Sequence, residues 1–197
     1  MPHPLERILK YLDLTPEQVD TLKSLMVEIR FKRGDKLTTR TQISGSAFYI
    51  KHGSARFFYI ANGKDNTFSF AFDDQFIIKP QYMMQSTDAV MSIEFLERTD
   101  VITIPERTTV ETIKGFKGIH DESLSIFFLT AMLEYSHFLE ERALLLQTAS
   151  AIERYRWLTQ RYPKVLERAT LTQIASYLGM TKETLYRIRA GKYGPKQ

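Results

Sequence analysis

The chain has 197 residues, of which 43% are hydrophobic and 25% are charged, and its formal net charge is +4. This length allows one sizeable core and a small second domain. The absence of cysteine excludes disulfides, thiolate zinc sites, cysteine-ligated iron–sulfur clusters and thiol-based redox sensing. Since the sequence shows neither a secretory signal pattern nor a run of about 18 apolar residues, we expect a cytoplasmic protein with no membrane partner.

Short strands dominate the first 104 residues. Two helices are predicted before them, at residues 4–12 and 15–26, the second with Thr15 as N-cap and Pro16 at its first position. β-branched and aromatic runs, several of them alternating with polar residues, predict strands at residues 27–31, 47–51, 54–60, 67–72, 91–97 and 101–104. The pair Asn62-Gly63 is typical of a tight hairpin turn. Strands at this spacing favour a small sandwich or a barrel-like roll.

A long helix is predicted from residue 121, because residues 121–161 contain no glycine or proline and have a helical pattern. One apolar stripe is interrupted by Arg142. A second stripe beside it indicates the seam of a homodimer and consists of Leu129, Met132, Leu139, Ala143 and Leu146. The alternative is that both stripes pack on the strand domain. A break at residues 148–150 precedes a helix at residues 151–161, with Trp157 as its anchor and Pro163 as its stop.

Residues 170–190 have the pattern of a helix-turn-helix. Thr170 caps a first helix, with Gln173 at the capping-box position. The core face of that helix consists of Ile174, Ala175 and Leu178. Gly179 allows a sharp turn, and Thr181 then caps a second helix whose inward stripe is Leu185 and Ile188. The alternative is a helical hairpin whose charged residues are only a solvated face.

The outward face of the second helix carries residues suited to the major groove. Arg187 can donate two hydrogen bonds to guanine, and Glu183 can accept one from the cytosine amino group. The complete set of predicted DNA contacts is Thr181, Lys182, Glu183, Tyr186, Arg187, Arg189 and Lys192, with the lysines and Arg189 assigned to phosphates. Residues 150–197 contain ten Lys and Arg against three acids, or +7, whereas the preceding residues carry −3. This asymmetry indicates a polyanionic partner at the C-terminal end.

These segments, with FKRGDKL at residues 31–37 and FYIKHGSAR at residues 48–56, resemble the Crp/Fnr superfamily of bacterial transcription factors. The resemblance implies an α+β chain with a cyclic-nucleotide-binding-like β-roll as sensor domain (residues 1–120), a long dimerisation helix (121–147) and a helix-turn-helix domain (148–197). It also implies a homodimer bound to a palindromic operator in double-stranded DNA, with RNA polymerase as a candidate partner. Glu183 and Arg187 match the family's Glu-x-x-x-Arg spacing.

Two departures from the family pattern bear on the ligand and on the wing, the β-hairpin that in the family usually follows the second helix of the helix-turn-helix. Ungapped alignment places Ile78-Lys79 where the family has Gly-Glu, and Ala89-Val90 where it has Arg followed by Ser or Thr. The candidate ligand pocket, made of Phe76, Ile78, Lys79, Ala89 and Val90, lacks the polar contacts that a cyclic nucleotide requires. We therefore expect no cyclic nucleotide and no cofactor, and the effector is left open. Only seven residues follow Ala190, so we expect a truncated or absent wing.

The sequence predicts a dimeric, DNA-binding transcriptional regulator. No Ser-His-Asp, phosphate-loop or metal-ligand spacing stands out, so neither an enzyme nor a metal site is expected. One alternative is a regulator that senses a cyclic nucleotide through atypical contacts. The other is a ligand-binding or protein-interaction module that does not bind DNA.

Overall fold

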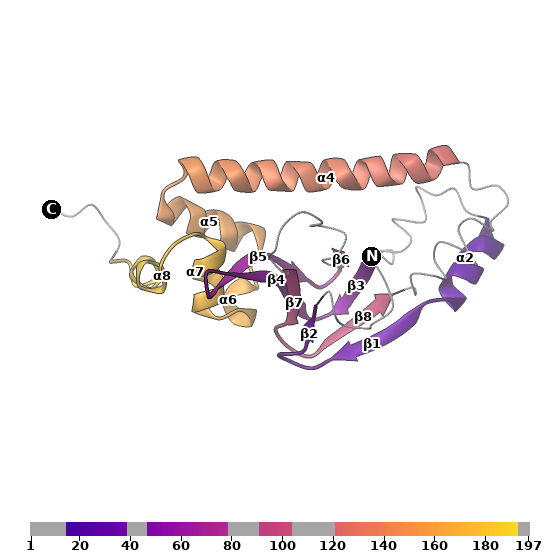
Figure 1. Ribbon diagram of the computed structural model, residues 1–197, viewed down its shortest axis with the longest axis horizontal. Coiled ribbons are helices and arrows are strands. Elements are labelled where there is room, and N and C mark those ends of the chain that lie inside the picture. Colours follow the sequence, from indigo (N-terminus) through magenta and orange to yellow (C-terminus); the bar gives the residue numbers. More distant parts are fainter. Residues whose placement is uncertain (1–14, 39–46, 79–90, 104–120, 193–197) are drawn as a thin grey trace.

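The fold is that of a computed structural model, which describes residues 15–38, 47–78, 91–103 and 121–192. A β-roll lies beneath one end of a long helix, and a group of short helices lies beneath the opposite end (Figure 1). The helix predicted at residues 4–12 falls outside the described residues.

The strands form two antiparallel sheets. In chain order they are β1 (Val27–Phe31), β2 (Lys36–Leu37), β3 (Ala47–His52), β4 (Ser54–Ala61), β5 (Lys64–Phe72), β6 (Phe76–Ile78), β7 (Met91–Phe95) and β8 (Thr99–Thr103). One sheet has the order β1-β8-β3-β6 and the other β2-β7-β4-β5. The predicted roll is therefore confirmed, and Asn62-Gly63 connects β4 to β5 as predicted.

The bounds of five of the six predicted strands differ from the prediction: β3 and β4 each end one residue later, and β5, β7 and β8 differ at one end by two or three residues. Because β4 pairs down to Ala61↔Lys64, β5 begins at polar Lys64 instead of at Thr67. β7 ends at Phe95 and β8 begins at Thr99, because Glu97 and its neighbours form the turn between these two strands. That turn is held by the Ser54 hydroxyl, which donates to Glu97 Oε1 at 2.7 Å.

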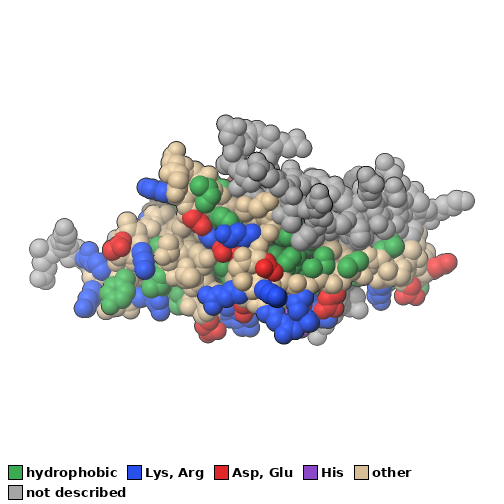
Figure 2. All heavy atoms as spheres, turned by 60° about the horizontal axis from the view of Figure 1, so that its bottom comes forward, with side chains coloured by type: hydrophobic (Ala, Val, Ile, Leu, Met, Phe, Trp, Pro, Cys, Tyr) green, Lys and Arg blue, Asp and Glu red, His purple; other side chains and the backbone are tan. Residues whose placement is uncertain are grey.

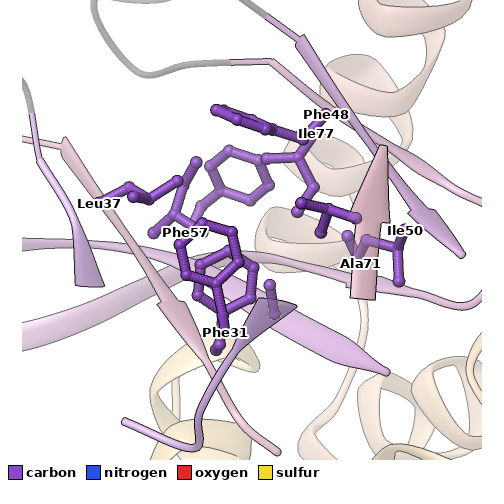
Figure 3. Close-up of a cluster of buried hydrophobic side chains, with 11 residues drawn as sticks. Phe31, Leu37, Phe48, Ile50, Phe57, Ala71 and Ile77 are labelled. Carbon is purple, nitrogen blue, oxygen red and sulfur yellow. The ribbon is translucent and has the colours of Figure 1, made fainter. Parts of the chain in front are cut away.

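Aromatic and aliphatic side chains fill the space between the sheets. Every strand contributes to this cluster, which contains Phe31, Leu37, Phe48, Ile50, Ala55, Phe57, Ala71, Ile77, Ile93, Phe95 and Val101 (Figure 3). The rings of Phe31 and Phe95 stack with centroids 4.0 Å apart, joining β1 to β7 across the roll. Burial of this apolar surface is the main force that closes the roll.

The helices are α2 (Pro16–Ser24), α4 (Asp121–Thr148), α5 (Ala151–Arg161), α6 (Val165–Arg168), α7 (Leu171–Tyr177) and α8 (Lys182–Arg189). Thr15 caps α2 as predicted, through a bond from the Gln18 N–H to its hydroxyl. The predicted break after α4 is confirmed: Ser150 is the N-cap of α5, in a capping box with Glu153. The short α6 was not predicted. Among the described residues, no helix has the length and hydropathy to cross a bilayer.

The arginine that interrupts the stripe on α4 has a structural explanation. The Arg142 guanidinium lies over the ring of Tyr177 at 4.3 Å and 5.6 Å from the centroid of Phe68. Arg142 is therefore on the inward face, where a cation is stabilised by aromatic rings. The predicted anchor Trp157 is only partly buried, and Leu158 is the fully buried residue of α5. Trp157 lies at the rim, where its Nε1 donates to Glu141 Oε1 at 2.8 Å.

Candidate nucleic-acid interface

Short-range hydrogen bonds fix both ends of α7. The Thr170 hydroxyl accepts from the Gln173 N–H at 3.3 Å, and the Gln173 side chain accepts from the Thr170 N–H at 2.9 Å. The predicted capping box is therefore present. At the other end Gly179 has φ +61°, and Met180 N donates to Ala175 O at 3.0 Å. This is a Schellman motif, which ends the helix and satisfies its last carbonyls.

A second cap starts α8 immediately after this turn. The Thr181 hydroxyl accepts from the Thr184 N–H at 3.1 Å, as the sequence predicts. Leu185 is fully buried and Ile188 nearly so, while on α7 Ile174 and Leu178 are fully buried as well. The predicted inward stripes of both helices are thus confirmed, and they fix which face of α8 points outward.

An arginine that the sequence analysis did not single out supports the turn between the two helices. Arg154 of α5 donates from Nη1 to Leu178 O at 2.7 Å and to Gly179 O at 3.3 Å. These carbonyls lie at the C-terminal end of α7, where a cation is favoured by the helix dipole. Because the contact joins residues 24 apart in sequence, no local pattern could have indicated it.

The outward face of α8 is exposed along its length. The predicted contact residues Thr181, Lys182, Glu183, Tyr186, Arg187, Arg189 and Lys192 are all exposed. Tyr186 is 64% exposed, an unusual state for a large aromatic side chain. Figure 2 shows Lys and Arg side chains at the end of the molecule formed by α8. The structure thus places acceptor, donor and aromatic groups together on one helix face.

The predicted dimer seam lies on a flank of α4. The side chains of Leu129 and Met132 fall outside the described residues. Leu139 is half-buried, and both Ala143 and Leu146 are exposed, the last at 37%. Leu146 also packs within its own chain, because a Cβ on Gly179 would lie 3.2 Å from Leu146 Cδ2. Two leucines outside the predicted seam, Leu133 and Leu144, are 53% and 60% exposed.

The predicted ligand pocket remains a prediction. Lys79, Ala89 and Val90 fall outside the described residues. Phe76 and Ile78 lie in β6, which pairs with β3, but their side chains are not among those described. Within the described part of the chain, no group of three His, Cys, Asp or Glu residues is arranged to hold a metal ion.

The similarity of this chain to known proteins lies in its fold. No family model matches the sequence, and no curated protein is similar to it. Among solved structures, FixK2 from Bradyrhizobium japonicum is similar with a TM-score of 0.65 and 18% identity, over 84% of this chain and 83% of that one. A protein from Eubacterium rectale assigned to the Crp/Fnr family is similar with a TM-score of 0.63 and 18% identity, over 91% and 83%.

A third similar structure is the c-di-GMP responsive global regulator CLP of Xanthomonas campestris. Its TM-score is 0.64 at 10% identity, over 90% of this chain and 91% of that one. At these identities the likeness is one of fold, and it extends over both the roll and the helix-turn-helix. The resemblance stated from the sequence is confirmed at this level: the chain has the fold of the Crp/Fnr transcriptional regulators.

Proposed function

We propose that this chain belongs to the Crp/Fnr family and acts as a homodimeric, sequence-specific DNA-binding transcriptional regulator. The observation that carries the proposal is the outward face of α8. Lys182, Glu183 and Arg187 are exposed there, on a helix whose opposite face is anchored by the fully buried Leu185. A helix held in this way can enter the major groove without deforming the protein.

The chemistry of this face suits a division between base reading and phosphate binding. Arg187 can form a two-pronged contact with guanine, and Glu183, one turn earlier on the same face, can accept from a cytosine amino group. Lys182 is the first residue of α8. When α8 lies in the major groove, this residue is next to the DNA backbone, so we assign it to a phosphate. The similar structures from Eubacterium rectale and Xanthomonas campestris are those of regulators, which supports the proposed regulatory role.

The test compares two cations of α8, Lys182 in its first turn and Arg187 in its last turn. The wild-type protein selects operators from a random duplex library, and anisotropy titrations at several salt concentrations follow. Arg187→Ala should cost about 1–3 kcal/mol at one guanine per half-site and relax the preference there. Lys182→Ala should weaken binding to all sequences and reduce the log–log salt slope by about one per half-site. Salt-independent binding, or none, would favour a protein-interaction module instead.

We also propose that α4 forms the dimer seam. Leu139→Glu with Ala143→Glu would place two charges in that seam, where unpaired burial costs several kcal/mol. We therefore expect a monomer in sedimentation equilibrium. Leu146 is left intact because it also contacts the α7–α8 turn. His137→Glu, which adds a charge on the other flank of α4, is the control and should remain dimeric. A dimer that survives the double substitution would show that the seam lies elsewhere.

A further inference from the structure

The helix-turn-helix unit, which here means α5 to α8, shares a buried core with the β-roll. Phe70 of β5 packs against Tyr177 of α7, with ring centroids 5.2 Å apart, and Phe72 packs against Tyr162 at 5.4 Å. Leu96, next to β7, belongs to the same cluster. In Figure 1, α7 accordingly lies beside β5. Apolar packing holds the two units together, but it is non-directional and does not by itself fix the angle between them.

Arg168 supplies a directional contact at one corner of this interface. Its Nη1 donates to Gly53 O at 3.0 Å and to Asp73 Oδ2 at 2.8 Å, and its Nε lies 3.3 Å from Glu97 Oε1. The three partners lie in three different turns, after β3, β5 and β7. The Arg168 side chain is 16% exposed, and a guanidinium has a rigid arrangement of donors. It therefore ties the end of α6 to three turns of the roll at once.

Asp73 is held in its charged form for this contact. Burial alone would raise the pKa of Asp73, but the Gly53 N–H and the Arg168 guanidinium lower it below its usual value. The Gly53 N–H donates to Asp73 Oδ1 at 2.8 Å, which orients the carboxylate with its other oxygen toward Arg168. Lys164 lies further away, with its Nζ 3.9 Å from Asp73 Oδ2 and its side chain 63% exposed.

A second directional contact lies at a bulge of β5. Phe68 has no partner in the β4 register, so the regular pairing is interrupted there. Next to it, the Thr67 N–H donates to the Ser176 hydroxyl of α7 at 2.9 Å, and that hydroxyl donates to Asp65 O at 3.2 Å. A longer bond, from Gln173 Nε2 to Glu94 Oε2 at 3.4 Å, also joins α7 to β7. Three separate groups of directional bonds therefore oppose rotation of the helix-turn-helix on the roll.

We propose that Arg168 is a positioning residue that sets this angle and, through it, the half-site spacing that the dimer accepts. The inference rests on the proposed function, because it requires a symmetric dimer on two half-sites. Each α8 is placed relative to its partner by the roll and α4 to which it is tied. One extra base pair moves a half-site by about 3.4 Å along the duplex and about 34° around it. A clamped unit cannot follow that displacement, whereas a loosened one can.

The experiment selects operators from a library in which two fixed half-sites are separated by spacers of varied length. We expect the wild-type protein to enrich one spacer, and Arg168→Ala to spread enrichment over neighbouring spacers with the half-site sequence unchanged. Asp73→Asn should broaden the profile in the same way, although it lies outside the DNA-binding helices. Lys164→Ala removes a neighbouring but exposed cation and should keep the wild-type profile. General damage to the fold would weaken all spacers equally.

Two outcomes would overturn the inference. If a variant of Arg168 binds DNA with the wild-type spacer profile, the positioning role of Arg168 is wrong and the proposed function stands. Absence of DNA binding by the wild type would remove both. If Arg168→Ala does not fold, Arg168→Lys decides in the same way, because lysine keeps the charge but cannot reach three turns with one ammonium. A broadened profile in that variant supports the positioning role, and an unchanged one contradicts it.

Discussion

Replacing Gly179 with alanine should destabilise the helix-turn-helix by about 2–3 kcal/mol. Gly179 has φ +61°, and a residue with a Cβ costs about 1–2 kcal/mol in this left-handed region. The added Cβ would also lie 3.2 Å from both Leu146 Cδ2 and Arg154 Nη1. Moving Nη1 weakens its bond to Leu178 O, and because charged hydrogen bonds contribute about 1.5–3 kcal/mol, we assign about 1 kcal/mol to its partial loss.

The same chain offers a matched control in Gly191. It ends α8 with φ +66° in the same Schellman arrangement, with Lys192 N bonded to Arg187 O at 2.9 Å. A Cβ on Gly191 would meet nothing within 4 Å. Gly191→Ala should therefore cost only the backbone contribution of about 1–2 kcal/mol, or less if the last turn unwinds. The additional loss at Gly179 measures the contacts behind the turn.

Urea unfolding followed by circular dichroism measures both losses. In a thermal unfolding experiment on a chain of this length, each kcal/mol of lost stability would lower Tm by about 2–4 °C. In a double-mutant cycle, Leu146→Ala should relieve part of the Gly179→Ala penalty, because it removes one of the two crowded atoms. Equal losses at Gly179 and Gly191 would refute the role assigned to the contacts. A loss below about 0.5 kcal/mol at Gly179, within the range of ordinary surface substitutions, would refute the positive φ itself.

Three further predictions concern pH, the operator and the ligand. Because Asp73 has a lowered pKa, its contribution to stability is complete above about pH 4 and is lost as the pH falls through the folded-state pKa. Asp73→Asn should therefore lose less stability than the wild type between neutral pH and pH 3, measured by urea unfolding. The exposed ring of Tyr186 can contact a thymine methyl group in the major groove. Deoxyuridine at one operator position should then weaken wild-type binding in anisotropy titrations but not that of Tyr186→Ala, and equal losses would reject the contact. Millimolar cyclic AMP or cyclic GMP should leave Tm unchanged, since ligand at a hundredfold its Kd would add about 2.7 kcal/mol; a clear rise would favour cyclic-nucleotide sensing.

The sequence by itself determined the features that depend on neighbours a few residues apart. The caps and the turn of the helix-turn-helix are made by residues three to five positions apart: the Thr170–Gln173 cap, the turn at Gly179 and the Thr181–Thr184 cap. These bonds are made inside one element, so residue type and spacing are sufficient to predict them. Helical periodicity similarly predicted which face of α8 is exposed, and with it the candidate DNA contacts.

Tertiary structure alone decided how distant segments meet. Arg168 binds Asp73 and Gly53 across 95 and 115 residues, and Arg142 finds its aromatic partners on α7 and β5. From sequence, Arg142 was only an interruption of an apolar stripe, and Tyr177 was not recognised as a core residue. Periodicity shows that a face is buried but not what covers it, because apolar attraction is non-directional and does not select a partner. The interface between the β-roll and the helix-turn-helix could therefore not be predicted from the sequence and is known only from the tertiary structure.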